Sequence, residues 1–156
     1  AATNMVILEN SEIVFSRDIA VGGMTYSHDL QKGLNVSLEE AEAIKLSVSN
    51  GQAAPQEAAG LLEATHEAVV EEIKGSFDFF LNTTKSQTIN RCFVTGGGSK
   101  TKGLVERLAK VAPCERLDPF FNIKHNPKAF SNDYIEQIRD FSAVVLGLAL
   151  RTPGDT

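Results

Sequence analysis

The chain has 156 residues, 42% of them apolar and 22% charged, which is typical of a globular domain with a hydrophobic core. Its net charge is −5 and no block of Lys or Arg is present, so nucleic acid is not expected as a partner. No apolar run reaches the roughly 18 to 20 residues that a membrane-spanning helix requires, and we expect no leader peptide.

The first predicted elements are two β-strands joined by a tight turn. Residues 5–8 and 13–19 are rich in apolar and β-branched side chains, and the polar residues 9–12 separate them. The pair Gly22-Gly23 ends the second strand, and a helical stretch is expected over residues 25–34. A hairpin followed by a helix is therefore predicted at the start of the chain.

A stronger helix signal begins at Ser37. Ser37 and Glu40 have the spacing of a capping box, in which each side chain accepts a hydrogen bond from the other residue's amide. The residues that follow place apolar side chains on one helix face: Leu38, Ala41, Ile44 and Val48. Asn50-Gly51 ends this helix, and one or two further helices are predicted over residues 55–82.

The second half of the chain continues with strands and helices. A buried strand is expected over residues 89–94, followed by a Gly-rich loop and an amphipathic helix over residues 100–111. A short extended piece covers residues 114–117, and a final helix ends at Leu150 after a bend near Asp140. Because the last ten residues of that helix are almost wholly apolar, we expect them to be buried. This order of elements predicts an α/β fold.

The sequence Gly96-Gly97-Gly98-Ser99, called the triglycine loop below, lies between the predicted strand and the predicted helix. Glycines allow a ligand to approach the backbone, and free amides at a helix start favour an anion, so the loop is a candidate phosphate site. It is not a Walker A loop, because Leu104 stands where lysine is needed. Nor is it a dinucleotide fingerprint, because Thr101 replaces the third glycine. The alternative is a turn that only packs helix against strand.

Glu42 and Lys45 are three residues apart on the helix that Ser37 begins, so both side chains project from one face. A glutamate can accept hydrogen bonds from ribose hydroxyls, and a lysine can lay its stem over an adenine ring. The alternative is an ordinary surface ion pair with little effect on stability. The pair contributes to a binding site only where this helix faces the triglycine loop.

No metal centre or catalytic nucleophile is expected. The three histidines, His28, His66 and His125, lie apart from one another and from the cysteines, and no GxSxG motif is present. Cys92 and Cys114 have neither metal-ligand nor CxxC spacing, so we expect two reduced and mostly buried thiols.

Five segments of the sequence together resemble the actin-like ATPase superfamily and, within it, the PilM family of type IV pilus assembly. They are residues 17–23, 40–45, 76–80, 95–100 and 144–151. The Gly-Leu-Ala-Leu-Arg ending favours PilM over the related FtsA and MreB. The resemblance covers essentially the whole chain and implies a C-terminal half. A ribonuclease-H-like subdomain would comprise residues 1–50 and 88–156, and the helical part of a smaller inserted subdomain residues 51–87.

The resemblance also implies a nucleotide site for ATP. The triglycine loop corresponds to the family's adenosine motif, which touches the nucleoside and the α-phosphate. The helix with Glu42 and Lys45 corresponds to the family's ribose and adenine contact. The implied nucleotide-binding residues are Thr3, Glu42, Lys45, Gly96, Gly97, Gly98 and Ser99.

One part of the family pattern is missing. The family's second phosphate loop has Asp-x-Gly followed by Thr at the end of the first, central strand. Here Ala1-Ala2-Thr3 matches only the tail of that pattern, so we expect a truncated half without its first strand. Such a piece should bind ATP weakly and should not hydrolyse it, because the Mg²⁺ that accompanies ATP in the intact protein would have too few partners. It should also have a remodelled sheet or marginal stability.

By this resemblance the intact protein is an ATP-binding cytoplasmic scaffold of type IV pilus assembly and twitching motility, peripheral to the bacterial inner membrane. It would dock the cytoplasmic tail of PilN and other alignment-complex proteins through its N-terminal half. ATP would bias the closure of the two halves, with slow or no turnover. The alternative is an FtsA-like or MreB-like polymer-forming ATPase in which this half supplies subunit contacts for a homo-oligomer. A sugar kinase is a third hypothesis, for which this half provides no catalytic aspartate.

Overall fold

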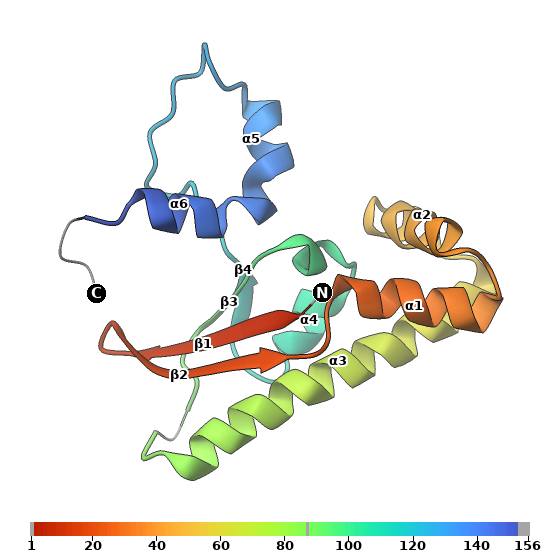
Figure 1. Cartoon of the computed structure of the whole chain (residues 1–156), viewed down its shortest axis with the longest axis horizontal. Helices are drawn as coiled ribbons and strands as arrows, with labels where there is room; N and C mark the ends of the chain where they lie inside the picture. The colour runs from red at the N-terminus through yellow and green to blue at the C-terminus, as the bar shows by residue number, and fades with distance from the viewer. Residues whose placement is uncertain (1, 87, 153–156) are drawn as a thin grey trace.

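The computed structural model describes residues 2–86 and 88–152 as a mixed α/β chain (Figure 1). The elements in chain order are β1 (Thr3–Glu9), β2 (Glu12–Ile19), α1 (Gly23–Leu34), α2 (Leu38–Ser49), α3 (Gln56–Thr83), β3 (Cys92–Val94), η1 (Gly97–Lys100), α4 (Leu104–Leu108), β4 (Cys114–Arg116), α5 (Asn132–Ile138), η2 (Arg139–Phe141) and α6 (Ala143–Ala149). Some predictions fall on residues outside the described ranges. They are the match of Ala1 to the end of the family's phosphate loop and the predicted subdomain boundaries at residue 87 and residues 153–156.

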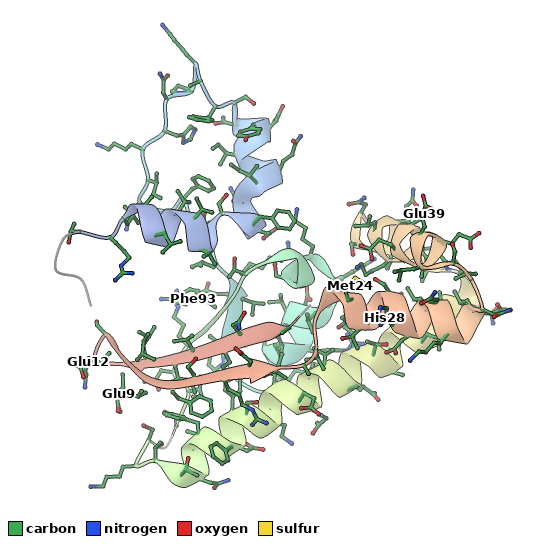
Figure 2. All side chains as sticks on the ribbon, in the orientation of Figure 1. Glu9, Glu12, Met24, His28, Glu39 and Phe93 are labelled. Atoms are coloured by element: carbon green, nitrogen blue, oxygen red, sulfur yellow. The ribbon has the colours of Figure 1, made fainter. Side chains whose placement is uncertain are left out.

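β1 and β2 form the predicted antiparallel hairpin. Its turn places Asn10 at φ 52° and Ser11 at φ 68°, both in the left-handed region. Such a two-residue turn matches the right-handed twist of the flanking strands. Figure 2 shows Glu9 and Glu12 at this turn, at the end of the hairpin that lies away from α1. The other end of the hairpin therefore leads into the helices.

The core forms where α3 runs along the hairpin and α1 (Figure 1). α3 is one continuous helix of 28 residues that passes through Gly60 and Gly75 without a break. It contacts β2 through Phe15 and Phe80, whose ring centroids are 5.6 Å apart. The buried apolar residues of this core are Met5, Ile19, Tyr26, Leu30, Ala41, Ala58, Leu62, Val69, Ile73, Phe77, Leu104, Leu108 and Ala112.

β3 and β4 are a short parallel pair, in which Cys92 lies opposite Cys114 with both thiols half-buried and reduced. The strand predicted over residues 89–94 is thus shorter than expected. The hairpin and this pair are two separate sheets, and β1 does not pair with β3. A cavity of about 760 Å³ lies between β1 and β3, with Ile73 and Leu108 among its lining residues.

The prediction of one helix over residues 100–111 is wrong. η1 is a four-residue 3-10 helix that ends at Lys100, and the next residue, Thr101, is extended with ψ 117°. Gly103 then has φ 89°, a left-handed conformation that favours glycine, and α4 starts at Leu104. These two backbone breaks divide the amphipathic segment in two.

The final helix is interrupted near Asp140 as predicted, because η2 separates α5 from α6. Its apolar end, however, is exposed rather than buried. No described element covers this face, and α6 stands apart from the hairpin and α3 (Figure 1). The exposed fractions are 61% for Phe141, 70% for Val144, 66% for Val145, 61% for Leu148 and 67% for Leu150. None of the described helices combines the length and the apolarity needed to cross a membrane.

Candidate functional site

Glu42 and Lys45 lie on α2, which begins at the predicted capping box. The Ser37 hydroxyl accepts from the amide of Glu40 at 3.2 Å, and the Glu40 carboxylate accepts from the amide of Ser37 at 2.8 Å. This cap fixes the start of α2 and hence the direction in which its later side chains project. The helix packs against α1, so Glu42 and Lys45 reach the beginning of α1.

The Lys45 ammonium lies in a network at the N-terminal end of α1. It donates to Glu42 Oε2 at 2.6 Å, to Ser27 Oγ at 3.0 Å and to the Gly23 carbonyl at 3.2 Å. Ser27 itself donates to the same Glu42 oxygen at 2.5 Å. Because an ammonium group has three protons, these three contacts use its whole donor capacity. Lys45 therefore ties α2 to α1 and holds the Glu42 carboxylate in place.

Glu42 keeps part of its carboxylate available. Its side chain is 39% exposed, against 12% for Lys45, and all of its described hydrogen bonds go to Oε2. Burial raises the pKa of Glu42, but the hydrogen bonds from Lys45 and Ser27 and the Lys45 charge together outweigh it and lower the pKa overall. Glu42 is therefore ionised at neutral pH, and its second oxygen can accept a hydrogen bond from a ligand.

The triglycine loop is a tight turn with free amides. Gly96 has φ 87°, which favours glycine, and leads into η1. Within the described residues the amides of Gly97 and Gly98 have no acceptor. Ser99 is buried at 1% exposure, and its hydroxyl donates to the Gly96 carbonyl at 2.7 Å, so its side chain holds the turn closed. Since η1 has only four residues, the amides of the loop, rather than a long helix dipole, are its anion-binding feature.

The triglycine loop and α2 meet at Gly23, the first residue of α1. A Cβ placed on Gly98 would lie 3.8 Å from the Gly23 amide nitrogen, and a Cβ placed on Gly23 would lie 3.9 Å from the Lys45 ammonium. Sequence reasoning used Gly22-Gly23 only as a strand terminator and missed this junction. The signal was available, because two glycines directly before a helix allow other backbone to approach its first turn.

Thr3 lies at the end of the hairpin that leads into α1. Its hydroxyl donates to the Val21 carbonyl at 2.7 Å, just before α1 begins. Figure 2 shows Met24 at this start of α1, opposite to the hairpin turn marked by Glu9 and Glu12. Thr3, Glu42, Lys45 and Gly98 thus meet the beginning of α1, and Gly96, Gly97 and Ser99 belong to the same loop as Gly98. The Thr3 and Ser99 hydroxyls are both engaged inside the protein.

The arrangement can bind a polar ligand with both an anionic and a hydroxyl-bearing part. In the first turn of the 12-residue helix α1, the Thr25 amide donates to the Gly22 carbonyl, and the amides of Gly23 and Met24 have no acceptor inside the helix. The free amides of the triglycine loop lie beside Gly23. Glu42 supplies a carboxylate oxygen for hydroxyl groups. A nucleotide, with its ribose and phosphates, has both. For a metal, the described residues contain no group of three or more His, Cys, Asp or Glu side chains that could hold one.

The cavity between β1 and β3 does not coincide with this site. It reaches Thr3 and Thr95 but neither Glu42 nor Gly98. The cavity is lined mostly by apolar strand and helix side chains, whereas the junction at Gly23 carries amides and the Glu42 carboxylate. For a polar ligand, the chemistry of these groups therefore favours the junction at Gly23 over the cavity.

Comparison with known proteins identifies relatives of the chain. The family model described as type IV pilus assembly protein PilM matches residues 1–153. No curated protein sequence matches the chain. Among solved structures, a PilM-PilN type IV pilus biogenesis complex is similar at a TM-score of 0.82 and 24% identity, covering 97% of this chain and 44% of that one.

A second solved structure is the ethanolamine utilization protein EutJ from Carboxydothermus hydrogenoformans. It aligns at a TM-score of 0.55 and 22% identity, covering 74% of this chain and 39% of that one. The expected α/β fold of an actin-like ATPase is confirmed by these two structures. The chain spans less than half the length of either of them.

Proposed function

The chain belongs to the family of type IV pilus assembly protein PilM, and we propose that it is the part of an ATP-binding scaffold that holds the adenosine of the nucleotide. The observation that carries this proposal is the junction at Gly23. There, the triglycine loop approaches the Gly23 amide through Gly98, and Lys45, which holds the Glu42 carboxylate, donates to the Gly23 carbonyl.

Each group at this junction suits one part of ATP. Glu42, ionised and partly exposed, accepts from the ribose hydroxyls. The free amides of Gly97 and Gly98, with the first turn of α1, donate to phosphate oxygens. Lys45 is a positioning residue, since its ammonium is fully engaged by Glu42, Ser27 and Gly23. Mg²⁺ and the γ-phosphate would need partners from beyond this chain, so turnover is slow or absent.

The scaffold role rests on the likeness to a PilM-PilN complex. The proposed partner is the cytoplasmic tail of a PilN-type protein, and the proposed location is the cytoplasmic face of the bacterial inner membrane. Because this chain spans 44% of the PilM chain it matches, no residue here is assigned to that contact. ATP would act by favouring one relative position of the scaffold's two halves.

Substitution at Gly98 tests the nucleotide site. A Cβ there meets only ordinary contact, and its backbone is not left-handed, so Gly98→Val should fold while blocking the approach of a ligand to the loop amides. In the full-length protein we expect ATP binding, measured by isothermal titration calorimetry, to weaken by about tenfold or more, equivalent to about 1.4 kcal/mol.

The matched control for this substitution is Gly75→Val on α3, where a Cβ meets open space far from the loop. Glu42→Gln should also weaken ATP binding, and more strongly than it weakens binding of a nucleotide analogue without ribose hydroxyls. Equal ATP affinity of the unmodified protein and the Gly98→Val variant would exclude this site.

A further inference from the structure

The triglycine loop is attached at both ends to segments that follow it in the sequence. The Asp140 carbonyl accepts from the Gly96 amide at 2.7 Å and from the Thr95 hydroxyl at 3.1 Å. At the other end, Arg116 donates to the Ser99 carbonyl at 2.7 Å. The triglycine loop is therefore held in place by η2 and β4 as well as by β3, the short strand that precedes it.

The side chains of η2 also contact the loop. The ring of Phe141 approaches Gly97 so closely that a Cβ on Gly97 would lie 3.1 Å from Phe141 Cε1. Lys100, the last residue of η1, lies 4.7 Å from the centroid of that ring and 3.5 Å from Asp140 Oδ2. One aromatic ring and one carboxylate of η2 thus hold both ends of η1.

Phe141 makes these contacts while remaining largely exposed. Its side chain is 61% exposed, whereas Asp140 is buried at 8%. A ring that exposed contributes little to the core, because stabilisation by burial scales with the apolar area removed from water. What Phe141 does in this structure is to occupy the space beside Gly97 and to accept a cation–π contact from Lys100.

η2 also connects the loop to α6. Ser142, which follows Phe141, donates through its hydroxyl to the Ile138 carbonyl at 2.8 Å and through its amide to the Arg139 carbonyl at 3.2 Å. α6 itself has no buried residue, and the element it contacts most is η2. The loop and α6 are therefore joined through a short, hydrogen-bonded segment.

We propose that Asp140 and Phe141 are positioning residues for the triglycine loop, and that through them nucleotide binding is coupled to the position of the apolar helix α6. This inference rests on the proposed nucleotide site. Phe141 and Asp140 hold Gly97 and Gly98 with their amides free, and a nucleotide on those amides in turn steadies η2 and α6. Such coupling is reciprocal for binding free energies.

Removal of the ring tests this coupling in the full-length protein. We expect Phe141→Ala to weaken ATP binding by about fivefold or more, the lower end of ordinary coupling, with an unchanged thermal unfolding midpoint. Phe141→Tyr keeps the ring and should restore affinity. Phe130→Ala is the matched control, because Phe130 is a 46% exposed aromatic residue of the same C-terminal segment that stacks on Tyr134, away from the loop.

Hydrogen exchange provides the second readout. ATP should slow amide exchange over residues 139–149 in the unmodified protein and in Phe130→Ala, and should not do so in Phe141→Ala at saturating ATP. If the unmodified protein binds ATP and Phe141→Ala binds it equally well, or shows the same protection of α6, the coupling is disproved while the nucleotide site stands. If the unmodified protein does not bind ATP, the proposed function fails, and this inference fails with it.

Discussion

Lys45 illustrates what a side chain's neighbours add to a sequence pattern. The spacing of Glu42 and Lys45 correctly predicts that they share a helix face, because i,i+3 neighbours on a helix are adjacent. It does not predict that Ser27 and the Gly23 carbonyl complete the network, since both come from another helix. The predicted contact of a lysine stem with adenine stays a prediction, and the ammonium has a structural role.

Tyr26 is the residue whose burial has the clearest effect on pH dependence. It is 1% exposed, lies edge-on to His66 with centroids 5.1 Å apart, and its hydroxyl has no partner among the described residues. Burial raises the pKa of Tyr26 well above its usual range and outweighs the charge of Arg107, which lowers it. Burial, with the hydrogen bond and charge of Cys92, also raises the pKa of Cys114 to about 12.

Tyr26→Phe should therefore reduce the loss of folding stability that occurs as the pH rises into the alkaline range. With a raised folded-state pKa, the stability that Tyr26 contributes is fully present below the unfolded value of about 10 and is lost as pH rises above it. The phenylalanine variant has no such group, so its urea midpoint should fall less between about pH 9 and 11. At pH 7 the two midpoints should be similar, because the hydroxyl removed is unpaired.

Tyr134 provides the control for this measurement, since it is 46% exposed whereas Tyr26 is buried. Tyr134→Phe should leave the alkaline slope of the urea midpoint unchanged. Cys114 titrates in every variant and so does not distinguish them. Identical slopes for Tyr26→Phe and the unmodified chain would show that burial does not hold the Tyr26 phenol neutral.

Elements defined by local signals could be predicted, and those defined by tertiary contacts could not. Ser37 and Glu40 lie within one turn, so the start of α2 follows from the sequence alone. The turn at Asn10 and Ser11 is equally local. The break at Gly103, by contrast, lies inside a segment whose apolar spacing favours one helix, although the glycine itself, at φ 89°, is a local signal for the break. The triglycine loop was predicted, but its fastening to η2 spans more than 40 residues of sequence.

Glycines in the two long core helices should respond oppositely to alanine. On α3, a Cβ at Gly60 meets open space, so Gly60→Ala should raise the free energy of unfolding by about 0.5–1 kcal/mol. On α1, a Cβ at Gly33 would lie 2.4 Å from Leu61 Cδ1 and 3.1 Å from Leu61 Cγ, where α1 crosses α3. Gly33→Ala should therefore destabilise the chain, because Leu61 must move.

The background variant Leu61→Ala separates the gain in helix propensity at residue 33 from the steric clash with Leu61. It removes the obstructing atoms, so Gly33→Ala should become stabilising in that background, as helix propensity alone predicts. Urea unfolding of the four combinations gives the coupling directly. A Gly33→Ala effect that is the same with and without Leu61 would show that the helix crossing does not depend on this glycine.

At the scale of the whole molecule, more large apolar side chains are exposed to solvent than the average composition of the chain suggests. Val6 and Leu8 are exposed on the hairpin, and Val144 and Leu148 on α6. The edges of β1 and β3 are also unpaired across the cavity between them. Burial of residues 141–150 was predicted from their composition, which is sound only where a partner surface exists. An apolar composition indicates that burial of a segment would be favourable, but it does not show that another part of the chain packs against it.

An exposed apolar helix face of this kind favours association. We expect the 156-residue chain to self-associate with rising concentration, measured by sedimentation velocity. Val144 and Leu148 share one face of α6, at 70% and 61% exposure, so Val144→Glu with Leu148→Glu should return the chain toward the monomer. Charge alone also opposes association, and the control Gln52→Glu with Gln56→Glu adds the same two charges at exposed positions away from α6. If the control suppresses association as strongly as the α6 variant, the apolar face is not its cause, and net charge is sufficient to explain it.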